Sequence, residues 1–548
     1  MGSSAEWAKE YPKFNPLLDQ AGVKWIRLFP GWHSIEAKQG EFDWTGADAI
    51  VANAKQNHLH VLGTWVFFPT WASADGGFRK GPIKDIQFWT DYVNASVGRY
   101  QKDIKYWEVW NEFNGGGFYQ GPDKPKEYAD LMIAAYDAAK KIDPTIKVGM
   151  SCANFDLNFF DAAIKAGAAN HFDFICVHPY ENLGTLASTD DGEQEFLGMT
   201  TSVRKMLADN NQPTDIPIWI TEVGKQAPVA PDPVKDQDQA VIMVKGYILS
   251  LAQGFQRLFW FEARGPAYGH GTDFGLIRAD WTTRPSYDAY KTMTTQLGPE
   301  PKFLGWLNLD NGGYGFMFRA PTGNVLVAWA NAKGGQKAKF TAEVKVTDLT
   351  GQTTPLPAGQ EYDLTKVPVF IAGVPDAIAA DAQANVGKPY PWSADYTTAS
   401  SVSLHFGANV DQGLRQVDGD KFAIVNGLTE SWASTLLNGK ISGMHMFRAA
   451  SSFLSSNAKS LDITVVARSS DPVKTSTVKI YFYESATGYK PAQDAFWKVP
   501  PGDQWQEHTW HVDDANFVGQ WGYNIALETR DGTPCFLKEL RVSKPATP

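Results

Sequence analysis

The sequence predicts an α/β protein: a (β/α)₈ barrel of the TIM type, a small antiparallel β-domain and a C-terminal β-sandwich of the jelly-roll type. Three observations lead to this fold class. Apolar strand-like runs alternate with helical patterns through about residue 298. From Pro299 the pattern changes to short alternating runs broken by Gly and Asn. After a stretch with several Pro residues near 375–395, the chain is again rich in short strands.

The length sets the number of domains. At 548 residues the chain is too long for one ordinary hydrophobic core. A typical domain size of about 150 residues suggests roughly two to four domains. We expect a catalytic barrel over residues 1–298 and a small β-sandwich domain packed on the barrel over 299–375. A linker over 376–395 then leads to a jelly roll over 396–548.

The barrel region contains seven expected strands, joined by helices at the spacing of right-handed parallel crossovers. The strands are expected at 23–29, 60–68, 104–110, 146–151, 172–178, 217–221 and 257–261. The helices are expected at 5–20, 47–56, 88–100, 126–142, 159–168, 193–209, 237–253 and 284–295. A closed barrel needs one more strand before the helix at 5–20. Few residues remain there, so we expect either that this strand is missing or that another segment takes its place.

The two β-domains are expected from runs that alternate between apolar and polar residues. In the small domain these runs lie at 315–318, 325–329, 342–346 and 368–371. In the sandwich they lie at 421–425, 461–466, 478–482, 506–512 and 536–542.

Composition narrows the class of partner. A formal net charge of −10 and a pI near 5.5 disfavour nucleic acid, because no basic run offers contacts to phosphates. A neutral ligand such as a polysaccharide or oligosaccharide fits better. The 20 tryptophans either stack on sugars or fill large cores. No apolar run reaches the ~18 residues of a membrane span.

Cysteines and the N-terminus bear on the compartment. Cys152, Cys176 and Cys535 are too few for a disulfide framework. Cys152 and Cys176 fall on strands that are expected side by side. A disulfide between them is therefore one alternative, and two buried free thiols are the favoured one. Residues 1–20 lack a basic-then-apolar signal pattern. We expect a secreted or periplasmic protein whose export signal lies outside this sequence.

Two strand-like runs end abruptly in a carboxylate. Glu112 ends the run at 107–111, and Glu222 ends the run at 217–221. In a barrel, residues at the carboxyl ends of the strands face the open mouth, so these two side chains can meet across it. One such Glu could do no more than hold a loop, whereas two in repeating strand-helix context predict a catalytic pair.

These segments resemble known motifs. The segment 107–112, Trp-Glu-Val-Trp-Asn-Glu, resembles the Asn-Glu motif that ends the fourth strand of clan A glycoside hydrolases. The segment 218–222, Ile-Trp-Ile-Thr-Glu, resembles their seventh-strand Glu. The strand at 23–29, the Gly-Glu-Phe-Asp-Trp at 40–44 and the β-domain after the barrel resemble family 39 and its neighbours. The resemblance covers about residues 20–375.

The resemblance implies a retaining β-glycoside hydrolase that acts by double displacement through a covalent glycosyl-enzyme. Glu112 would be the general acid that later acts as base, and Glu222 would be the nucleophile. In retaining enzymes the two carboxyl groups lie ~5–5.5 Å apart. We expect no cofactor and no metal ion, because the histidines are too scattered to propose a site.

The resemblance also implies positioning and binding roles. Arg27 would lie beneath the nucleophile as its charge partner. His178 and Tyr180 match a His-x-Tyr pair that supports the catalytic carboxylates. Asn111 would bind the substrate 2-hydroxyl, and Trp260 would form an aromatic floor under the sugar. For Arg27, His178 and Trp260 a purely structural role is the alternative.

Further residues near the strand ends have less specific signals. We interpret Glu108 as a buried structural partner. Glu262, two residues after Trp260, contacts substrate or ties a loop. Trp65 belongs to a group of aromatic residues expected at the mouth, some as sugar subsites and the rest as loop packing: Trp32, Trp65, Trp71, Phe118 and Tyr119.

The C-terminal domain has its own cluster of aromatic residues: Trp497, Trp505, Trp510, Trp521 and Tyr523. Sandwiches attached to glycosidases often resemble carbohydrate-binding modules. Sugar binding and core packing are both open for this domain.

Two other functions remain as alternatives. A non-catalytic carbohydrate-binding protein on a degenerate barrel is disfavoured, because Asn111, Glu112 and Glu222 are all intact. A transglycosylase would form the same covalent intermediate but pass the sugar to an acceptor other than water. Product analysis with an added sugar acceptor separates it from a hydrolase.

Overall fold

A computed structural model describes residues 10–545 with short gaps. The gaps are 78–80, 189–191, 266–270, 311, 393–395, 397, 407–409, 420–422, 426–427, 432–435, 438–439, 442–443, 455–459, 486–487, 495, 518–521 and 531–532. The strand predicted to precede the first helix would fall within residues 1–9, outside the described residues, as does Trp521. Among the described residues, no helix has both the length and the apolar character needed to span a bilayer.

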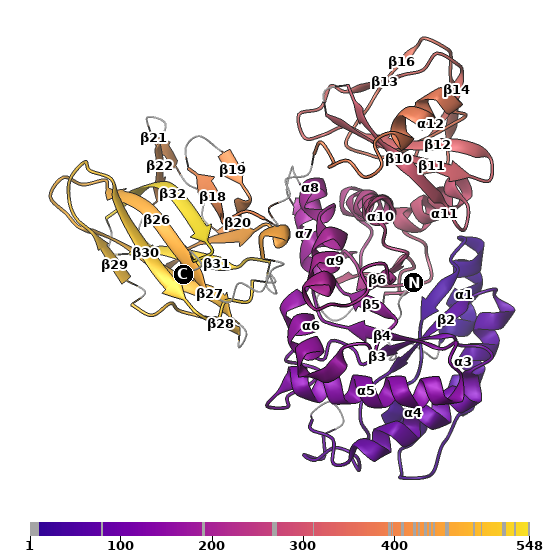
Figure 1. Ribbon diagram of the computed structural model, residues 1–548. Coiled ribbons are helices and arrows are strands. Elements are labelled where there is room, and N and C mark those ends of the chain that lie inside the picture. The colour runs from indigo at the N-terminus through magenta and orange to yellow at the C-terminus, as the bar shows by residue number, and fades with distance from the viewer. Residues whose placement is uncertain are drawn as a thin grey trace. The chain divides into compact units, whose positions relative to one another are not determined.

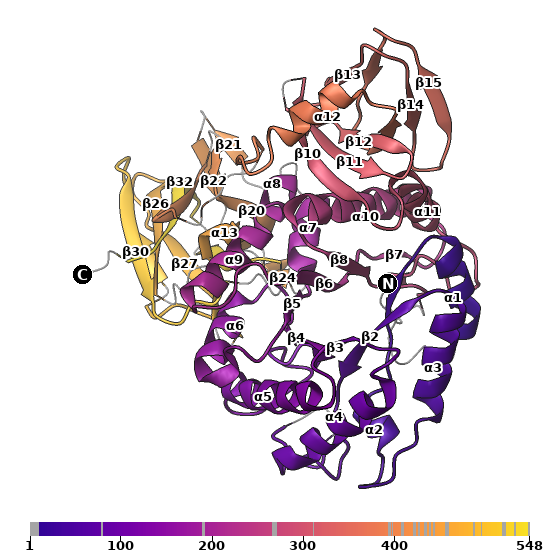
Figure 2. The ribbon, with the colours of Figure 1, turned by 45° about the vertical axis from the view of Figure 1, so that its right-hand side comes forward.

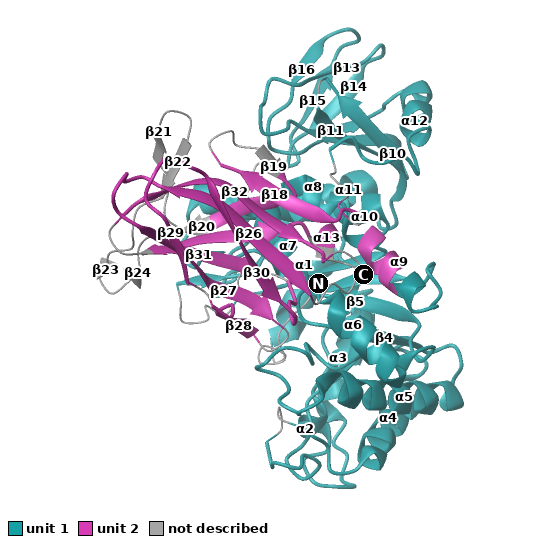
Figure 3. Ribbon diagram, turned by 60° about the vertical axis from the view of Figure 1, so that its left-hand side comes forward, with its two compact units in different colours: residues 1–200, 207–393 teal, residues 201–206, 394–548 magenta. Residues whose placement is uncertain are grey.

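The chain divides into two compact units. The first comprises residues 1–200 with 207–393, and the second comprises 201–206 with 394–548 (Figure 3). The first unit contains the barrel and the small β-domain, and the second contains the C-terminal sandwich.

Seven parallel strands form the wall of a nearly closed barrel (Figure 1). They are β1 (Trp25–Arg27), β2 (His60–Trp65), β3 (Tyr106–Val109), β4 (Lys147–Ser151), β5 (Phe174–Val177), β6 (Ile218–Val223) and β8 (Arg257–Trp260). Their order in the sheet is the order of the chain, and β1 and β8 contact each other. Each of the seven strands predicted from the sequence overlaps one of these, which confirms the predicted barrel architecture over the described residues.

Helices cover the outside of the strand ring, as Figure 2 shows for α3, α5, α6 and α10. The helices are α1 (Tyr11–Gln20), α2 (Trp32–Ile35), α3 (Thr45–Gln56), α4 (Ile86–Tyr100), α5 (Lys124–Ile142), α6 (Leu157–Ala163), α7 (Tyr180–Ser188), α8 (Gly192–Phe196), α9 (Met199–Asp209), α10 (Pro233–Gln253) and α11 (Pro285–Leu297). A π-helical turn, η2 (Ile164–Ala168), follows α6. The single helix predicted at 193–209 is two helices, with Gly198 in the break between them.

Aspartate residues fix the starts of several of these helices. The side chains of Asp85, Asp123, Asp156 and Asp232 each accept a hydrogen bond from a backbone N–H in the first helical turn. Such caps satisfy donors that have no partner within the helix. They therefore set where each strand-to-helix loop at the mouth of the barrel ends.

The barrel interior is layered. Alternate strand residues point inward, and a lower layer of them is largely apolar: Trp25, Leu62, Tyr106, Phe174, Cys176, Trp219 and Phe259. Two residues further along β1, β3 and β6 the corresponding side chains are Arg27, Glu108 and Thr221, and the same step from Cys176 leads to His178. The strands thus change from apolar to polar toward their carboxyl ends, where the site forms.

The small β-domain is built on one six-stranded sheet in the order β10-β11-β12-β17-β14-β15. Its strands are β10 (Lys302–Leu309), β11 (Gly313–Ala320), β12 (Gly323–Trp329), β13 (Lys337–Lys339), β14 (Val344–Thr347), β15 (Thr353–Leu356), β16 (Glu361–Asp363) and β17 (Val369–Ala372). The stretch predicted as a linker contains helix α12 (Asp376–Gln383), and Ala379 and Ala382 of this helix are buried in the core of the domain.

The second unit is a two-sheet sandwich over a shared apolar core. One sheet contains β18 (Ser401–His405), β19 (Val410–Gln412), β21 (Ala423–Val425), β22 (Leu428–Ser431), β26 (Leu461–Ser469), β30 (Gln506–Val512) and β32 (Cys535–Ser543). The other contains β20 (Leu414–Gly419), β25 (Met444–Ala449), β27 (Ser476–Ser485), β28 (Gly488–Lys490), β29 (Phe496–Val499) and β31 (Ile525–Arg530). The β-sandwich that the alternating pattern of the sequence predicts is therefore confirmed here.

Alternation also separates the aromatic residues of the sandwich. Trp510 and Tyr523 are buried, and the indole N–H of Trp510 donates to the Asp494 carbonyl. Trp497 and Trp505 are half-buried. The ring of Trp497 stacks on His508, and the Arg468 guanidinium lies over the Trp505 ring.

The three cysteines Cys152, Cys176 and Cys535 are free and buried. The favoured prediction of buried thiols is confirmed, and Cys152 and Cys176 form no bridge.

Candidate active site

The two predicted catalytic carboxylates come together at the carboxyl ends of β3 and β6. One carboxylate oxygen each of Glu112 and Glu222, and one ring nitrogen of His178, all lie within 4.8 Å of one another. The Glu112 and Glu222 side chains retain 17% and 16% exposure, so the pair is reachable from solvent. Two carboxylates this close to each other, in a partly exposed position, can act on the same bond of a bound molecule.

Arg27 holds one of the two carboxylates. Its Nη1 donates to Glu222 Oε2 at 2.8 Å, its Nε donates to Glu108 Oε2 at 2.6 Å, and its Nη2 donates to Asn111 Oδ1 at 2.8 Å. A guanidinium can serve three acceptors at once because its donors form a rigid planar fork. Arg27 therefore fixes three side chains from β3, its following loop and β6 relative to one another.

Tyr180 and Asn111 complete the surroundings of the carboxylates. The Tyr180 hydroxyl donates to Glu222 Oε1 at 2.9 Å, so both oxygens of Glu222 are hydrogen-bonded. Because a guanidinium only donates, Arg27 must bind the carbonyl oxygen of Asn111. The amino group of the Asn111 side chain is then left to donate elsewhere.

His178 contacts the other carboxylate. Its Nδ1 lies 3.0 Å from Glu112 Oε1, and its Nε2 lies 3.1 Å from Thr221 Oγ1. The Thr221 hydroxyl donates to Glu108 Oε1 at 2.8 Å. His178 and Glu108 are fully buried. A continuous chain of polar contacts thus joins Glu112 to Glu108 through His178 and Thr221.

Electrostatics in the cluster favour its charged forms. Burial alone would raise the pKa of Glu108, but Arg27 and His178 outweigh it and lower the pKa of Glu108 to about 2. Burial would likewise lower the pKa of His178, but hydrogen bonds to Glu108 and Glu112 raise it to about 9. Burial and the neighbouring Glu222 raise the pKa of the Tyr180 hydroxyl well above its usual range. Tyr180 therefore remains a donor to Glu222 at neutral pH.

The backbone around Glu112 is in an uncommon conformation. Trp110 has a φ of 65° and Glu112 has a φ of 54°, in the left-handed region that non-glycine residues rarely occupy. Such residues cost on the order of 1 kcal/mol each and cluster at functional sites. The strand end bends sharply at Asn111 and Glu112.

Two further predicted residues lie close to this cluster along the strands. Trp260 ends β8, pairs with Val223 next to Glu222, and is fully buried. Its indole N–H has no hydrogen-bond acceptor in the described part of the chain. Glu262 is also fully buried, and its charge helps to raise the pKa of Tyr180 after burial, Glu222 and Glu112.

Trp65 is not brought to the cluster. Its indole N–H donates to Ser96 Oγ of α4 at 3.0 Å, and its ring stacks on Trp107 at 4.8 Å. It is fully buried on the helix side of the sheet. This position does not support the sugar-binding role predicted for Trp65.

The other aromatic residues predicted at the mouth divide between the interior and the surface. Trp32 and Tyr119 are buried, and the indole N–H of Trp32 donates to Glu36. Trp71 and Phe118 keep partial exposure.

The set of Glu112, His178 and Glu222 has the donor types of a metal site. However, both ring nitrogens of His178 are engaged, one with Glu112 and the other with Thr221. A His178 pKa of about 9 keeps the ring protonated near neutrality, without a lone pair for a metal. We therefore assign no metal to these residues.

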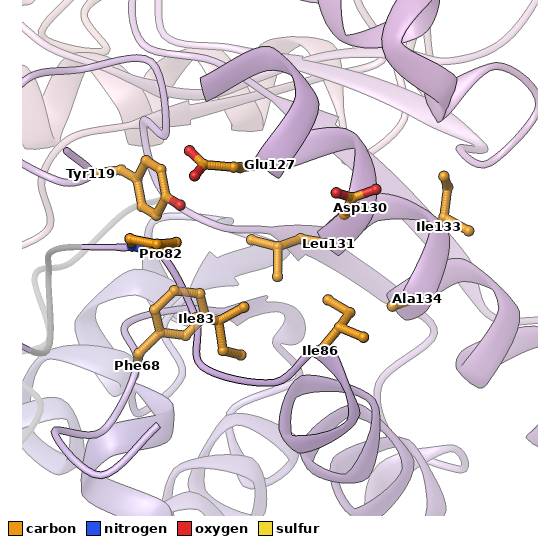
Figure 4. A pocket seen from close by; sticks show the side chains of 10 residues that line it. All are labelled: Phe68, Pro82, Ile83, Ile86, Tyr119, Glu127, Asp130, Leu131, Ile133 and Ala134. Carbon is orange, nitrogen blue, oxygen red and sulfur yellow. The ribbon is translucent and has the colours of Figure 1, made fainter. Parts of the chain in front are cut away.

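A cavity of about 520 Å³ lies beside helices α4 and α5 (Figure 4). It is lined mainly by apolar side chains, with Tyr119, Glu127 and Asp130 among them. Among the described side chains that line it, Tyr119 was predicted at the barrel mouth, and none belongs to the cluster around Glu112 and Glu222. The cavity and the carboxylate pair are separate features.

No role was predicted for Thr221, which the structure places between His178 and Glu108. A strand period of two from Trp219 puts Thr221 on the inner face, and this signal could have identified it. Glu108 is buried, as predicted, and its Oε2 accepts a hydrogen bond from Arg27, a partner that was not predicted.

The family of the barrel follows from comparison with known sequences. Residues 75–295 match the family described as Glycosyl hydrolases family 39. The barrel carries a glycosyl hydrolases family 39 domain. The matched residues include Glu112, His178 and Glu222 of the cluster described above.

Curated relatives of this chain include xylanases. Endo-1,4-beta-xylanase 1 of Gibberella zeae is 27% identical over 143 residues, which is 25% of this chain and 39% of that protein. Endo-1,4-beta-xylanase 3 of Hypocrea jecorina is 28% identical over 131 residues, which is 23% of this chain and 37% of that protein. The match thus spans less than two fifths of the length of each of these relatives.

Solved structures share the fold. A family 39 glycoside hydrolase from Bacteroides cellulosilyticus WH2 is 20% identical, with a TM-score of 0.56 over 68% of this chain and 79% of that chain. A monomeric beta-xylosidase from Caulobacter crescentus CB15 is 18% identical, with a TM-score of 0.51 over 68% of this chain and 94% of that chain. At these identities the likeness establishes the fold.

Proposed function

We propose that this protein is a retaining β-glycoside hydrolase that cleaves a polysaccharide or oligosaccharide through a covalent glycosyl-enzyme. The observation that carries the proposal is the pair of Glu112 and Glu222, with carboxylate oxygens within 4.8 Å of each other. Retaining enzymes need their carboxyl groups ~5–5.5 Å apart, whereas inverting enzymes leave ~6.5–9.5 Å for a water molecule.

Glu222 is the nucleophile in this proposal. Arg27 and Tyr180 each donate to one of its oxygens, which holds the carboxyl group in a fixed orientation. In the first step Glu222 attacks the anomeric carbon, and the glycosidic C–O bond breaks as the C–O bond to Glu222 forms.

Glu112 is the general acid and base. In the first step it gives its proton to the departing glycosidic oxygen, and in the second it takes a proton from the water that attacks the glycosyl-enzyme. The second step releases Glu222 and returns the sugar with its original anomeric configuration. Among the described residues, the hydrogen-bond partner of the Glu112 side chain is His178 Nδ1, a group that can itself give or take a proton.

Asn111 and Trp260 bind the sugar of the substrate in this proposal. With its oxygen held by Arg27, Asn111 presents its amino group, which suits a bond to the substrate 2-hydroxyl. The indole N–H of Trp260 needs an acceptor, and a sugar hydroxyl can supply one. Glu262 is buried near Tyr180 and is proposed as a further contact at this end of the site.

The relatives direct the choice of substrate. The xylanases among them act on β-1,4-linked xylan by name, so xylan, xylo-oligosaccharides and aryl β-xylosides are the first substrates to test. A polymeric substrate of this kind is met outside the cytoplasm, which supports a secreted or periplasmic location. Carbohydrate binding by the C-terminal sandwich stays a prediction, with Trp497 and Trp505 as its candidate stacking rings.

Two variants test the assignment of roles. Glu222→Ala should abolish turnover of every substrate, because no covalent intermediate can form. Glu112→Ala should cut kcat/KM by about 100-fold or more on xylo-oligosaccharides but by less than about tenfold on glycosides with activated leaving groups, which depart without an acid. The measurement is the release of sugar and of aryl alcohol by purified protein.

A matched control lies outside the site. Glu193 is buried on α8 and paired with Lys245, so Glu193→Gln should retain the kinetics of the parent protein. Full activity of both site variants would overturn the proposal. Activity that transfers sugar to an added acceptor rather than to water would favour a transglycosylase. Binding of xylan without turnover by the parent protein would favour a carbohydrate-binding barrel.

A further inference from the structure

Glu108 lies at the inner end of the polar chain that begins at Glu112. Its Oε2 accepts from Arg27 Nε at 2.6 Å and its Oε1 accepts from the Thr221 hydroxyl at 2.8 Å. Its Oε1 also lies 3.7 Å from His178 Nε2. The side chain is fully buried and makes these contacts in the middle of the barrel.

The directions of the hydrogen bonds along this chain are set by Glu108. Because Arg27 and His178 outweigh burial and lower the pKa of Glu108 to about 2, its carboxylate only accepts. The Thr221 hydroxyl has one proton, and it gives this proton to Glu108. Thr221 Oγ1 can therefore only accept from His178 Nε2, which must carry a proton.

The protonation of Nε2 decides what His178 offers to Glu112. When the ring is neutral, Nδ1 has a lone pair and accepts from a protonated Glu112. When Glu112 is ionised, the ring is an imidazolium and Nδ1–H donates to the carboxylate. In both states the contact at 3.0 Å is satisfied, and only one proton moves between Oε1 and Nδ1.

We propose that Glu108 is a positioning residue that acts through Thr221 to keep the proton on Nε2 of His178, so that Nδ1 exchanges a proton with the acid/base Glu112. This inference rests on the proposed function for the role of Glu112. No other proton donor or acceptor is needed for this exchange, because the proton that Glu112 loses is the one that His178 gains, and Glu112 regains it from His178.

The charged groups that face His178 act on the protonation of its ring in opposite directions. Glu108 on β3 and Glu112 after β3 favour the doubly protonated ring, as does Glu222 on β6, whereas Arg27 on β1 opposes it. The balance leaves the pKa of His178 at about 9 in spite of burial. Loss of the Glu108 charge would remove one of the largest contributions that favour the protonated ring.

The decisive variant is Glu108→Gln. An amide of the same shape can donate to Thr221, whose hydroxyl then turns toward Nε2 and favours the opposite tautomer, with the proton on Nδ1. With ¹⁵N-labelled histidine, Nε2 of His178 in the parent protein should show a protonated nitrogen across the pH range from about 6 to 10. In Glu108→Gln it should show an unprotonated nitrogen at about pH 7. The His178→Asn variant identifies the signals.

Thr221 supplies the matched pair. Thr221→Val has the same shape but no hydroxyl, so it should change the Nε2 signal in the same direction as Glu108→Gln. Thr221→Ser keeps the hydroxyl and should behave as the parent protein. A change in Glu108→Gln without a change in Thr221→Val would overturn the relay through Thr221.

Kinetics separate a positioning role from a structural one. Glu108→Gln should lower kcat by about 100-fold on substrates with poor leaving groups, but by less than about tenfold on activated aryl glycosides, because the acid step alone is affected. The alkaline pKa in its profile of kcat/KM should move to lower pH. Glu193→Gln removes another buried carboxylate and should leave both readouts unchanged.

The results that would overturn the role of Glu108 differ from those that would overturn the proposed hydrolase function. An Nε2 signal of His178 that is the same in the parent, Glu108→Gln and Thr221→Val proteins would overturn the inference, whatever the activity. An equal loss on all leaving groups would also overturn it, since a folding or packing defect does not select among them. An inactive parent protein with the predicted Nε2 signals would count against the proposed function and leave the relay standing.

Discussion

At the scale of single residues, Arg27 connects the parts of the site. One guanidinium serves Glu222, Glu108 and Asn111 through three different nitrogens. Burial costs a cation several kcal/mol unless it is paired, and here two carboxylates raise the pKa of Arg27 above its usual range despite burial. The same side chain thus pairs with buried carboxylates and orients the groups that we propose to meet the substrate.

Arg27→Lys tests this connection. Lysine keeps the positive charge but has a single nitrogen, so it cannot reach all three acceptors in the same geometry. We expect kcat to fall by about 100-fold or more, with a smaller change in KM, because the orientation of Glu222 is lost. Steady-state kinetics on aryl β-xylosides measure both constants. An unchanged kcat would show that charge alone is sufficient at this position.

Strand alternation explains which residues the sequence could place. Glu112 and Glu222 were predicted from strand ends, and Arg27 from the cost of an unpaired cation inside a strand. Trp65 was misplaced because it follows the inward-facing Thr64, so it faces the helices. The link from Thr221 to His178 depends on the stagger between β5 and β6, which single-strand patterns do not contain.

At the scale of elements, a buried ion pair joins the barrel helices to the small β-domain. Lys245 of α10 lies 2.6 Å from Glu193 of α8, and both side chains are under a tenth exposed. Trp329 of β12 donates to the same Glu193 oxygen at 3.1 Å. Three elements that are distant in the sequence therefore meet at one carboxylate.

Glu193→Gln should destabilise the first unit by on the order of 3 kcal/mol, because Lys245 is left buried without its countercharge. Urea unfolding measures the change. The control is Asp130→Asn, which breaks an exposed pair with Lys126 and should cost less than about 1 kcal/mol. Equal effects of the two variants would contradict the account of the buried pair.

The elements themselves were largely predictable. Seven barrel strands were expected, and the barrel wall of the structure has seven parallel strands. They could be predicted because a buried parallel strand appears in the sequence as a distinct apolar run. The split of α8 from α9 and the short helix α7 were missed, since turn positions inside a helical pattern depend on packing. The helix α12 was taken for a linker because its alanines carry little periodic signal.

At the scale of the whole molecule, the cluster that we propose to be catalytic also affects the stability of the fold. Folding lowers the pKa of Glu108 from 4.5 to about 2 and raises the pKa of His178 from 6.5 to about 9. Shifts of this size correspond to on the order of 3 kcal/mol each, and the two overlap because they share one interaction.

The pH dependence follows from the signs of these shifts. The contribution of Glu108 is present above pH 4.5 and is lost as the pH falls toward about 2. The contribution of His178 is present below pH 6.5 and is lost as the pH rises toward about 9. We expect the first unit to be most stable between about pH 5 and 6.5.

Urea unfolding across this pH range measures the effect, and comparison with His178→Asn cancels contributions from the second unit. The parent protein should lose stability relative to His178→Asn as the pH rises from 6.5 to about 9. A difference between the two proteins that does not change with pH would contradict the raised pKa of His178.

The separate functions of the two units are to be determined by experiment. The proposed catalytic residues lie in the first unit, where both carboxylates, Arg27 and His178 are found. In the second unit Trp510 and Tyr523 are buried, and Trp497 and Trp505 are half-buried. The domain boundaries remain predictions, since the stretch at 376–395 begins with a helix that packs into the small β-domain.

The most direct test of the central claim is the anomeric configuration of the first product. Proton NMR during the first minutes of hydrolysis of a xylo-oligosaccharide or aryl β-xyloside distinguishes the two anomers before they equilibrate. With Glu112 and Glu222 as close as they are, we predict that the β-anomer appears first and the α-anomer follows only by mutarotation. An α-anomer formed first would show inversion and would contradict the double displacement through Glu222.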